Sequence, residues 1–396
     1  MMIYSSLKLN KADVFVYASV LFFILDNIYN SFFKAPIFVL AIPFLILLTI
    51  INIKNKKNLI MVLFLVSIVV ISYYLNFFRF GFSIDSSSDI LFVMLTLFTF
   101  AAVNESSASE RCLDNSFWLL LMLFLPAFLG FNGRTFGDSD VFESGSTDIE
   151  YFRVYNQGFY RFPHTAAYVL ALGAIWWSIK YQFYRKNKYI IFSIIFISAC
   201  LYTGSRTPIF AFLIGVLFNF FRPKILNVIY ILISISTIIV FLYNIDLILE
   251  FFNGTIFYQY LTIFVTIQEN YERLSRYMIW NSWLEAVKEF NVVDYLIGHS
   301  YGESLKFNEN KLDRSIWFHN DYLSFFYSYG ILFLLLYIKF IFNFFKNFFK
   351  EKSSFLIRCL VFFIIISAFL NGFYKYMPML FLFVLSYYRF HFSKRS

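Results

Sequence analysis

The sequence has few charged residues. Only 14% of its 396 residues are Asp, Glu, Lys or Arg, whereas a soluble domain carries about 25%. Hydrophobic residues make up 60% of the chain, and the mean hydropathy is +0.67. The 58 Phe and 29 Tyr suit lipid contact and aromatic belts at membrane interfaces. This composition excludes an ordinary soluble enzyme and predicts a polytopic membrane protein.

Cysteine is also scarce. Cys112, Cys200 and Cys359 are far apart, so they offer neither metal-ligand spacing nor a disulfide framework. The sequence contains no Walker motif, no Gly-x-Ser-x-Gly and no His-Glu-x-x-His. We therefore expect no ATP-driven activity, no metal site and no cofactor.

Hydrophobic runs predict an all-α protein with about twelve transmembrane helices, because a membrane helix needs about 20 mostly apolar residues. The chain is expected to form one integral membrane domain, residues 1–396. The predicted spans are residues 13–33, 35–53, 59–78, 90–103, 116–131, 164–183, 188–204, 207–221, 225–245, 321–345, 355–371 and 376–391.

The distribution of Lys and Arg predicts the orientation. If the N-terminus is cytoplasmic, most cations fall in inner segments, and the short outer loops carry only Lys34, Arg79, Arg206 and Lys375. The positive-inside rule then places both termini in the cytoplasm. Two long loops, 132–163 and 246–320, lie outside, and both are acidic overall. Topology therefore explains the net charge of +9, and no nucleic-acid partner is expected.

The transmembrane runs themselves hold little charge. Asp26 is the one carboxylate in a clear span, and we expect it near the outer interface. No paired interrupted spans mark two repeated halves, as they do in many transporters. A transporter is therefore only a distant alternative, because it would need charged residues within its spans and here the charge gathers on the outer loops.

Polar residues cluster where three predicted spans begin at the outer face, and a helix start is a ready anion site. The first, residues 158–165, opens the sixth span. Pro163 suits a first helical turn, and Arg161 and His164 are candidates to contact an anionic or sugar ligand. The alternative is an arginine anchored among lipid headgroups.

The second start is Thr203-Gly204-Ser205-Arg206-Thr207-Pro208. Ser205 or Thr207 can cap the next helix. Arg206 then lies beside the positive end of the helix dipole, which makes sense if an anion shares the site. The alternative is a snorkelling arginine, and we favour the anion site.

The third start closes the long polar stretch 246–320 with Trp-Phe-His-Asn-Asp-Tyr. We expect Asn320 to cap the tenth span and His319 to lie just outside it. A helix N-terminus disfavours imidazolium, so His319 should be neutral near pH 7, as a general base requires. The alternative is an interfacial histidine with a single hydrogen bond. Tyr322 follows as a candidate acceptor-binding residue.

The same loop contains a predicted amphipathic helix, residues 269–284. Tyr277, Trp280, Leu284 and Val287 recur at helical spacing, and Arg273, Arg276 and Trp280 share the neighbouring face. Such a helix either lies on the outer leaflet or brings one or both arginines to the anion at Arg206. His299 nearby is expected to be structural.

The order of these motifs resembles the O-antigen polymerase and O-antigen ligase superfamily (Wzy and WaaL). The resemblance covers about residues 150–345 and the twelve-span layout. It rests on Gly158-Phe159 with Pro163-His164, Gly204-Ser205-Arg206, Arg276-x-x-x-Trp280, Gly298 with Gly302, and His319-Asn320 followed by Gly330. His164 departs from the pattern, because many relatives have Asn after the proline.

The resemblance implies an inverting, metal-independent glycosyltransferase at the outer face of the bacterial inner membrane. Its donor and acceptor would be polyprenyl-pyrophosphate-linked oligosaccharides, and a chain-length regulator is a possible partner. It assigns pyrophosphate binding to Arg206 and Arg276, with Arg273 as a competitor, and base catalysis to His319. Beside these carried-over roles, Asn320, Tyr322, Trp280, Arg161 and His164 are candidate supporting or acceptor-binding residues. A polymerase is favoured, and a ligase that transfers the glycan to lipid A core is the alternative. A lipid-linked glycan flippase or another transporter is a more distant alternative.

Overall fold

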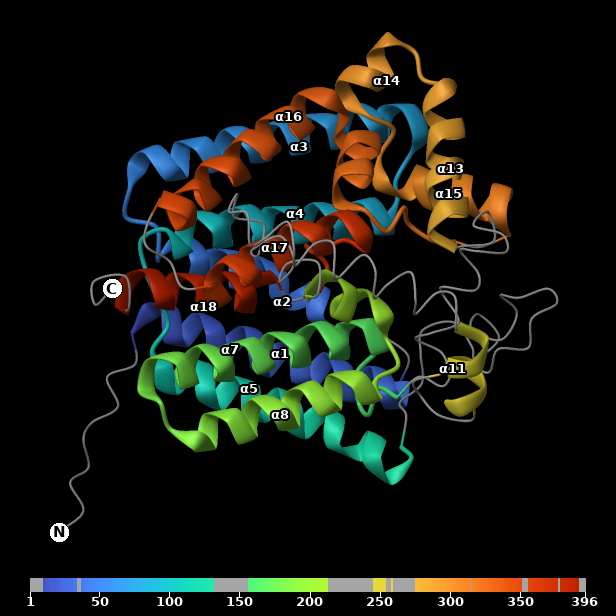
Figure 1. Cartoon of the computed structure of the whole chain (residues 1–396). Coiled ribbons are helices and arrows are strands. Elements are labelled where there is room, and N and C mark those ends of the chain that lie inside the picture. Colours follow the sequence, from blue (N-terminus) through green and yellow to red (C-terminus); the bar gives the residue numbers. More distant parts are fainter. Residues whose placement is uncertain are drawn as a thin grey trace, which may run out of the picture.

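Every regular element that the structure describes is a helix, as the composition predicts (Figure 1). The structure is a computed structural model that describes residues 10–33, 37–131, 156–212, 245–253, 258, 275–313, 315–350, 355–376 and 378–391. Its elements are α1 (Lys11–Phe33), α2 (Phe38–Ile50), α3 (Lys56–Phe80), α4 (Ile84–Val103), α5 (Glu110–Phe124), η1 (Leu125–Leu129), α7 (Pro163–Tyr184), α8 (Asn187–Tyr202), α11 (Ile245–Phe251), α13 (Ser275–Lys288), α14 (Val292–Ile297), α15 (Tyr301–Leu312), α16 (Asp321–Lys350), α17 (Phe355–Leu370) and α18 (Pro378–His391).

Several of these helices identify the chain as a membrane protein. Among the described residues, five segments are long and apolar enough to cross a bilayer: α1, α3, α4, α5 continued by η1, and α16 as far as Lys346. The helices α2, α8 and α17 are apolar but shorter. The count of twelve spans stays a prediction, because most of residues 207–245 lies outside the described part of the chain.

For two spans, the predicted first residue lies several residues after the observed start of the helix. The fourth and fifth were expected to start at residues 90 and 116, but α4 starts at Ile84 and α5 at Glu110. Their polar first turns are stabilised by side-chain caps, in which Ser83 accepts from the Ser86 amide and Ser109 from the Cys112 amide. Capping serines extend a helix beyond its apolar run.

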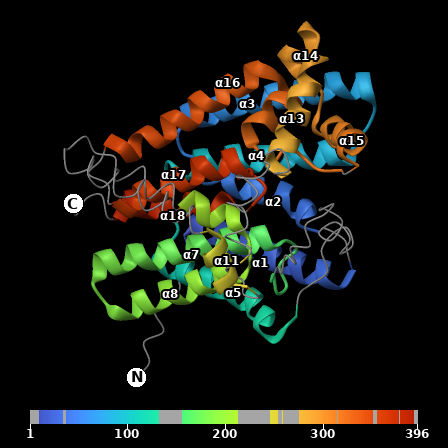
Figure 2. The same ribbon diagram turned by 45° about the vertical axis from the view of Figure 1, so that its right-hand side comes forward.

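Helices α1 to α5, α7, α8 and α16 to α18 form one bundle around a common apolar core. Figure 1 shows α7 and α8 as a hairpin beside α5 and α1, with α3, α4 and α16 on the other side and α17 and α18 between. Figure 2 shows the same arrangement in a turned view. The start of α1 and the end of α18 lie at the same end of the bundle. Asp26 is buried within α1, where its carboxylate accepts from the Ile37 and Phe38 amides and so caps α2.

Three helices, α13, α14 and α15, form a cap at the opposite end of the bundle (Figure 1). A second apolar cluster holds the cap on the start of α16; its buried members are Ile279, Ala286, Phe290, Phe318, Phe326 and Tyr327. The prediction of which side chains form the apolar face of α13 is therefore partly wrong. Trp280 and Val287 pack on this cluster, whereas Tyr277 and Leu284 are exposed, because α13 packs against protein through a different face.

Two glycines allow the cap to approach α16 closely. Gly298 and Gly330 have φ of 75° and 80°, a backbone region that side chains disfavour. A β-carbon at Gly298 would overlap the backbone of Ser328, and one at Gly330 would overlap the Leu296 carbonyl. Gly330 also interrupts the helical geometry of α16. These two motif glycines thus have a structural role at the contact between α14 and α16.

Candidate active site

His319 lies in a sharp turn directly before α16. Its φ of 51° turns the backbone, and the next residue caps the helix, because the Asn320 Oδ1 accepts from the Tyr322 amide at 3.0 Å and the Leu323 amide at 3.1 Å. The predicted cap is confirmed. The Trp317 ring lies 5.1 Å from the imidazole, centroid to centroid. Among the residues that the structure describes, His319 Nδ1 is buried without a hydrogen-bond partner.

Groups from three other parts of the chain face this imidazole. Burial lowers the pKa of His319 well below 6.5, and the positive charge of Arg276 lowers it further, followed by His164 and Lys375. The Asn371 side chain is within hydrogen-bonding reach of the ring and acts in the opposite direction. The neutral imidazole expected from the sequence is therefore supported, but burial and neighbouring cations are its main causes.

His164, in the first polar helix start, contacts the second polar helix start at Ser205. It lies in the first turn of α7, which begins at Pro163 as predicted, and its Nδ1 is 2.5 Å from the Ser205 hydroxyl. Arg206 follows Ser205, is partly buried, and begins the helical residues 206–212. Because His164 also acts on His319, the structure brings all three starts to one place.

Arg276, on helix α13 of the cap, also lies near His319. Its guanidinium donates a hydrogen bond to the Asn371 carboxamide oxygen, and the Asn371 nitrogen donates to the Tyr376 hydroxyl at 3.2 Å. Tyr376 stacks on Tyr168 of α7 with ring centroids 5.1 Å apart. The carboxamide of Asn371 thus links the cap arginine to the core of the bundle.

Lys375 is a second site residue that the sequence did not single out. Its ammonium is 3.0 Å from a carboxylate oxygen of Asp89 on α4 and 3.4 Å from the centre of the Tyr301 ring. Asp89 is buried and also accepts from the hydroxyls of Tyr329 at 2.7 Å and Tyr374 at 2.5 Å. One signal was available: a lysine in a short outer loop runs against the positive-inside rule.

The turn that carries Asn371 and Lys375 is fixed against the segment around His319. The Asp321 carboxylate accepts from the backbone amides of Phe373, at 2.8 Å, and Tyr374, at 3.3 Å. A β-carbon at Gly372 would overlap the Trp317 ring. Backbone hydrogen bonds and close packing therefore hold both side chains beside the histidine.

The other residues singled out from the sequence occupy different surroundings. Arg161 lies toward α1, where its amide donates to Asn27 Oδ1 at 2.7 Å and its guanidinium interacts with Asp26. Trp280 packs on Phe369 of α17, with ring centroids 5.2 Å apart. Tyr322 packs against the bundle core. Arg273 lies outside the described residues.

His299 is structural, as expected. Its amide donates to the Tyr327 carbonyl at 2.7 Å, its ring stacks on Phe290, and its Nε2 is 3.0 Å from Asp294 Oδ1. These contacts fix the loop between α14 and α15 on α16.

We expect His319 to remain neutral when the pH falls through 6.5, since its lowered pKa means that it takes up a proton only at more acidic pH. Replacing Arg276 with glutamine removes a positive neighbour, so the pKa should rise. Selective ¹⁵N labelling of the four histidines makes both titrations measurable by NMR, and His319→Gln identifies the signal. A transition of the native His319 at 6.5 that Arg276→Gln leaves unchanged would contradict this electrostatic account.

The arrangement combines a neutral base with cationic groups. The imidazole of His319 has a buried nitrogen without a described partner. Arg276, His164 and Lys375 act on it, and His164 contacts Ser205, the residue before Arg206. Such a site is suited to remove a proton from a hydroxyl while the cations offset developing negative charge.

Comparison with known proteins gives no further guide to the chemistry. No protein family model matches this chain, and neither a curated protein nor a solved structure matches it.

Proposed function

We propose that the chain is a membrane glycosyltransferase of the Wzy and WaaL type. It transfers a glycan from polyprenyl pyrophosphate to a hydroxyl of another lipid-linked repeat unit, and so polymerises O-antigen or a related surface polysaccharide. The observation that carries this proposal is the convergence of three polar helix starts on His319. The contact between His164 and Ser205 and the action of Arg276 and His164 on the imidazole define it.

The proposed reaction needs one base and an anion site. The acceptor hydroxyl oxygen attacks the anomeric carbon while the bond from that carbon to the pyrophosphate oxygen breaks, which inverts the configuration. His319 accepts the hydroxyl proton. Arg206 and Arg276 offset the charge on the departing pyrophosphate, and Arg273 is kept as a competitor for the role of Arg276. Bound sugar or phosphate oxygens would occupy the place that His319 Nδ1 faces.

The proposed topology has twelve spans, both termini in the cytoplasm and the site facing outward from the bacterial inner membrane. The common position of the start of α1 and the end of α18 supports an even number of crossings. The long polar loop then lies in the same compartment as His319.

Cysteine labelling tests this orientation. Asn310 and Lys186 are both exposed, so a cysteine at either position is reachable in solution. In intact cells with a permeable outer membrane, Asn310→Cys should react with an impermeant maleimide, and Lys186→Cys should react only after the inner membrane is disrupted. The reverse pattern would overturn the proposed topology.

Deletion of the gene distinguishes the polymerase function from the ligase function. Without a polymerase, a glycan gel should show core carrying a single repeat unit. Without a ligase, it should show unmodified core together with lipid-linked polymer. The first pattern supports the function proposed here, and the second assigns the same site to the alternative reaction.

We expect Asn371→Ala to lower the polymerisation rate on the order of 100-fold, the loss typical of a misplaced catalytic group. The variant removes the carboxamide that holds Arg276 and approaches His319. Asn371→Asp should instead raise the pKa of His319, because it introduces a negative charge beside the imidazole, and the acid limb of the pH–rate profile should move to higher pH. The exposed Asn310→Ala is the matched control. A native rate and profile in both Asn371 variants would exclude this positioning role.

A further inference from the structure

The short helix α14 exposes apolar side chains although it belongs to the polar outer loop. Val292 is 75% exposed, Leu296 53% and Val293 51%. Figures 1 and 2 both place α14 at the outermost edge of the molecule, beside α3 and α16. Exposed apolar side chains grouped in this way usually mark a surface that contacts lipid or another protein.

The charged group of α14 faces the protein. Asp294 is only 2% exposed. Its carboxylate accepts from Arg79 of α3 at 2.5 Å and from the Asn291 amide at 2.9 Å, and it lies 3.0 Å from His299 Nε2. Because these groups neutralise Asp294 internally, the outward side of α14 carries no charge.

The apolar surface of α14 continues that of a membrane-spanning helix. Of the five candidate spans, α3 has the smallest buried share, 28% of its apolar window, so most of its surface is left for lipid. Two contacts fix α14 along the last turns of α3: the Ser72 hydroxyl donates to the Ile297 carbonyl, and Arg79 pairs with Asp294. Phe78, between these two positions on α3, is 81% exposed.

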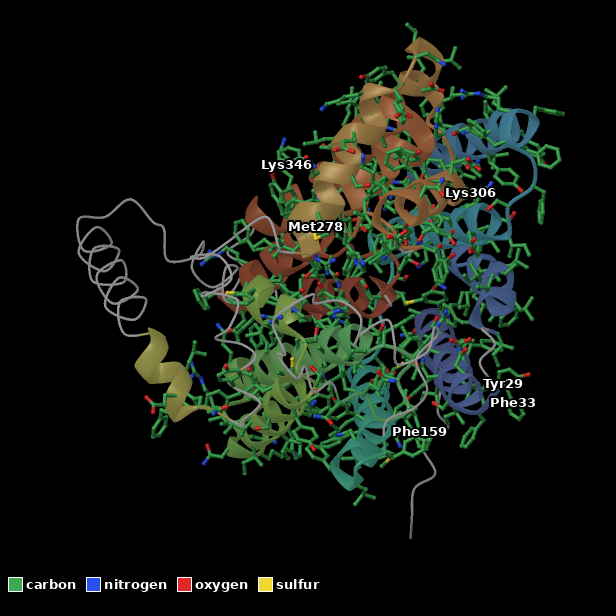
Figure 3. All side chains as sticks on the ribbon, turned by 90° about the vertical axis from the view of Figure 1, so that its right-hand side faces the viewer. Tyr29, Phe33, Phe159, Met278, Lys306 and Lys346 are labelled. Carbon is green, nitrogen blue, oxygen red and sulfur yellow. The ribbon has the colours of Figure 1, made fainter. Side chains whose placement is uncertain are left out.

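The neighbouring helix of the cap has the opposite character. Lys306 on α15 is 62% exposed, and Glu309 and Lys311 are exposed as well. Figure 3, which looks onto the cap, labels Lys306 on α15 and Met278 on α13. The cap therefore has a charged side on α15 and an uncharged, apolar edge on α14.

We propose that α14 is a lipid-binding element, whose Val292, Val293 and Leu296 insert, together with Phe78, into the acyl-chain region of the adjacent phospholipid leaflet. Its partner is the bilayer itself. Helices with an apolar face bind membranes in this way. The anchoring role considered for the α13 segment is proposed here for α14, because α14 runs along the candidate membrane span α3, whereas α13 packs on the start of α16. This proposal does not depend on the enzymatic function.

Spin labelling in phospholipid nanodiscs tests the proposal with the full-length chain. The three native cysteines are buried, so the label attaches to an added cysteine. The three sites are Val293→Cys on α14, Phe64→Cys on the exposed middle of α3 as a lipid reference, and Lys306→Cys as an aqueous reference. Power saturation then compares collisions with oxygen, which enters lipid, and with a water-soluble nickel complex.

At Val293 we expect collisions with oxygen to exceed those with nickel several-fold, as at Phe64, and the opposite ratio at Lys306. Nickel access at Val293 equal to that at Lys306 would overturn the proposal. Low access of both reagents would also overturn it, since a second protein copy would then cover α14. Val292→Cys repeats the measurement at the most exposed position, so the result does not depend on one labelled variant.

Discussion

Replacing His319 with alanine should abolish long glycan chains while the protein still inserts and folds. Arg276, His164 and Lys375 all act on this buried imidazole. A positioned general base contributes about 100- to 10,000-fold to a rate. Because the Asn320 cap uses its own side chain, removal of the neighbouring imidazole leaves the start of α16 intact.

A complementation assay measures this effect directly. Chain length is read on a glycan gel in a deletion strain, and the amount of membrane-inserted protein is compared in parallel. His391→Ala is the matched control, because His391 ends α18 at the other end of the bundle and stacks on Tyr387. Native chain length in His319→Ala, at normal protein level, would exclude His319 as the catalytic base.

Arg206→Ala belongs to the same experiment and should give the same loss. Its proposed role is to bind pyrophosphate, and a guanidinium can form two parallel hydrogen bonds to phosphate oxygens. Arg206→Lys keeps the charge without that geometry, so it should retain only part of the activity. Equal activity of the native, lysine and alanine proteins would remove Arg206 from the mechanism.

Replacing Gly330 with alanine should destabilise the fold more than the same change at Gly81. Both glycines have nearly the same backbone, with φ of 80° and 83°, so both variants carry a strain of about 1–3 kcal/mol. A β-carbon at Gly81 meets nothing within 4 Å, whereas one at Gly330 overlaps the Leu296 carbonyl. The difference between the two variants therefore isolates the contact between α14 and α16.

A thiol-reactive dye can follow this unfolding, because Cys112, Cys200 and Cys359 are all buried. The apparent melting temperature in detergent should fall modestly for Gly81→Ala and clearly further for Gly330→Ala. Since Gly330 positions the cap, its variant should also lose activity. Equal melting temperatures would show that the close approach of the two backbones is not needed for stability.

Local patterns predicted the helices well. Apolar runs place the start of α16 at Asp321 and that of α17 at Phe355, and both starts agree with the structure. Pro163 and Asn320 mark helix starts through their own backbone and side-chain chemistry. Such signals succeed because they depend on residues within one or two turns of each other.

The composition of the site was only partly predictable. The sequence singled out His164, Arg276 and His319, and the structure brings their side chains together. It gave no role to Asn371 or Lys375, whose neighbours Arg276 and Asp89 lie far away along the chain. The predicted face of α13 was partly wrong for the same reason, because helical spacing does not say which neighbour a helix will meet.

The sequence by itself determined that this is a helical membrane protein, where most helices begin and end, and which polar residues stand at helix starts. Hydropathy and capping act locally, so they can be read along the chain. Only the tertiary structure decided that three of these starts meet at His319, that the turn with Asn371 and Lys375 lies beside the imidazole, and that α14 turns its apolar side outward. Those outcomes depend on how helices distant in sequence pack together, which the side chains of many elements settle jointly.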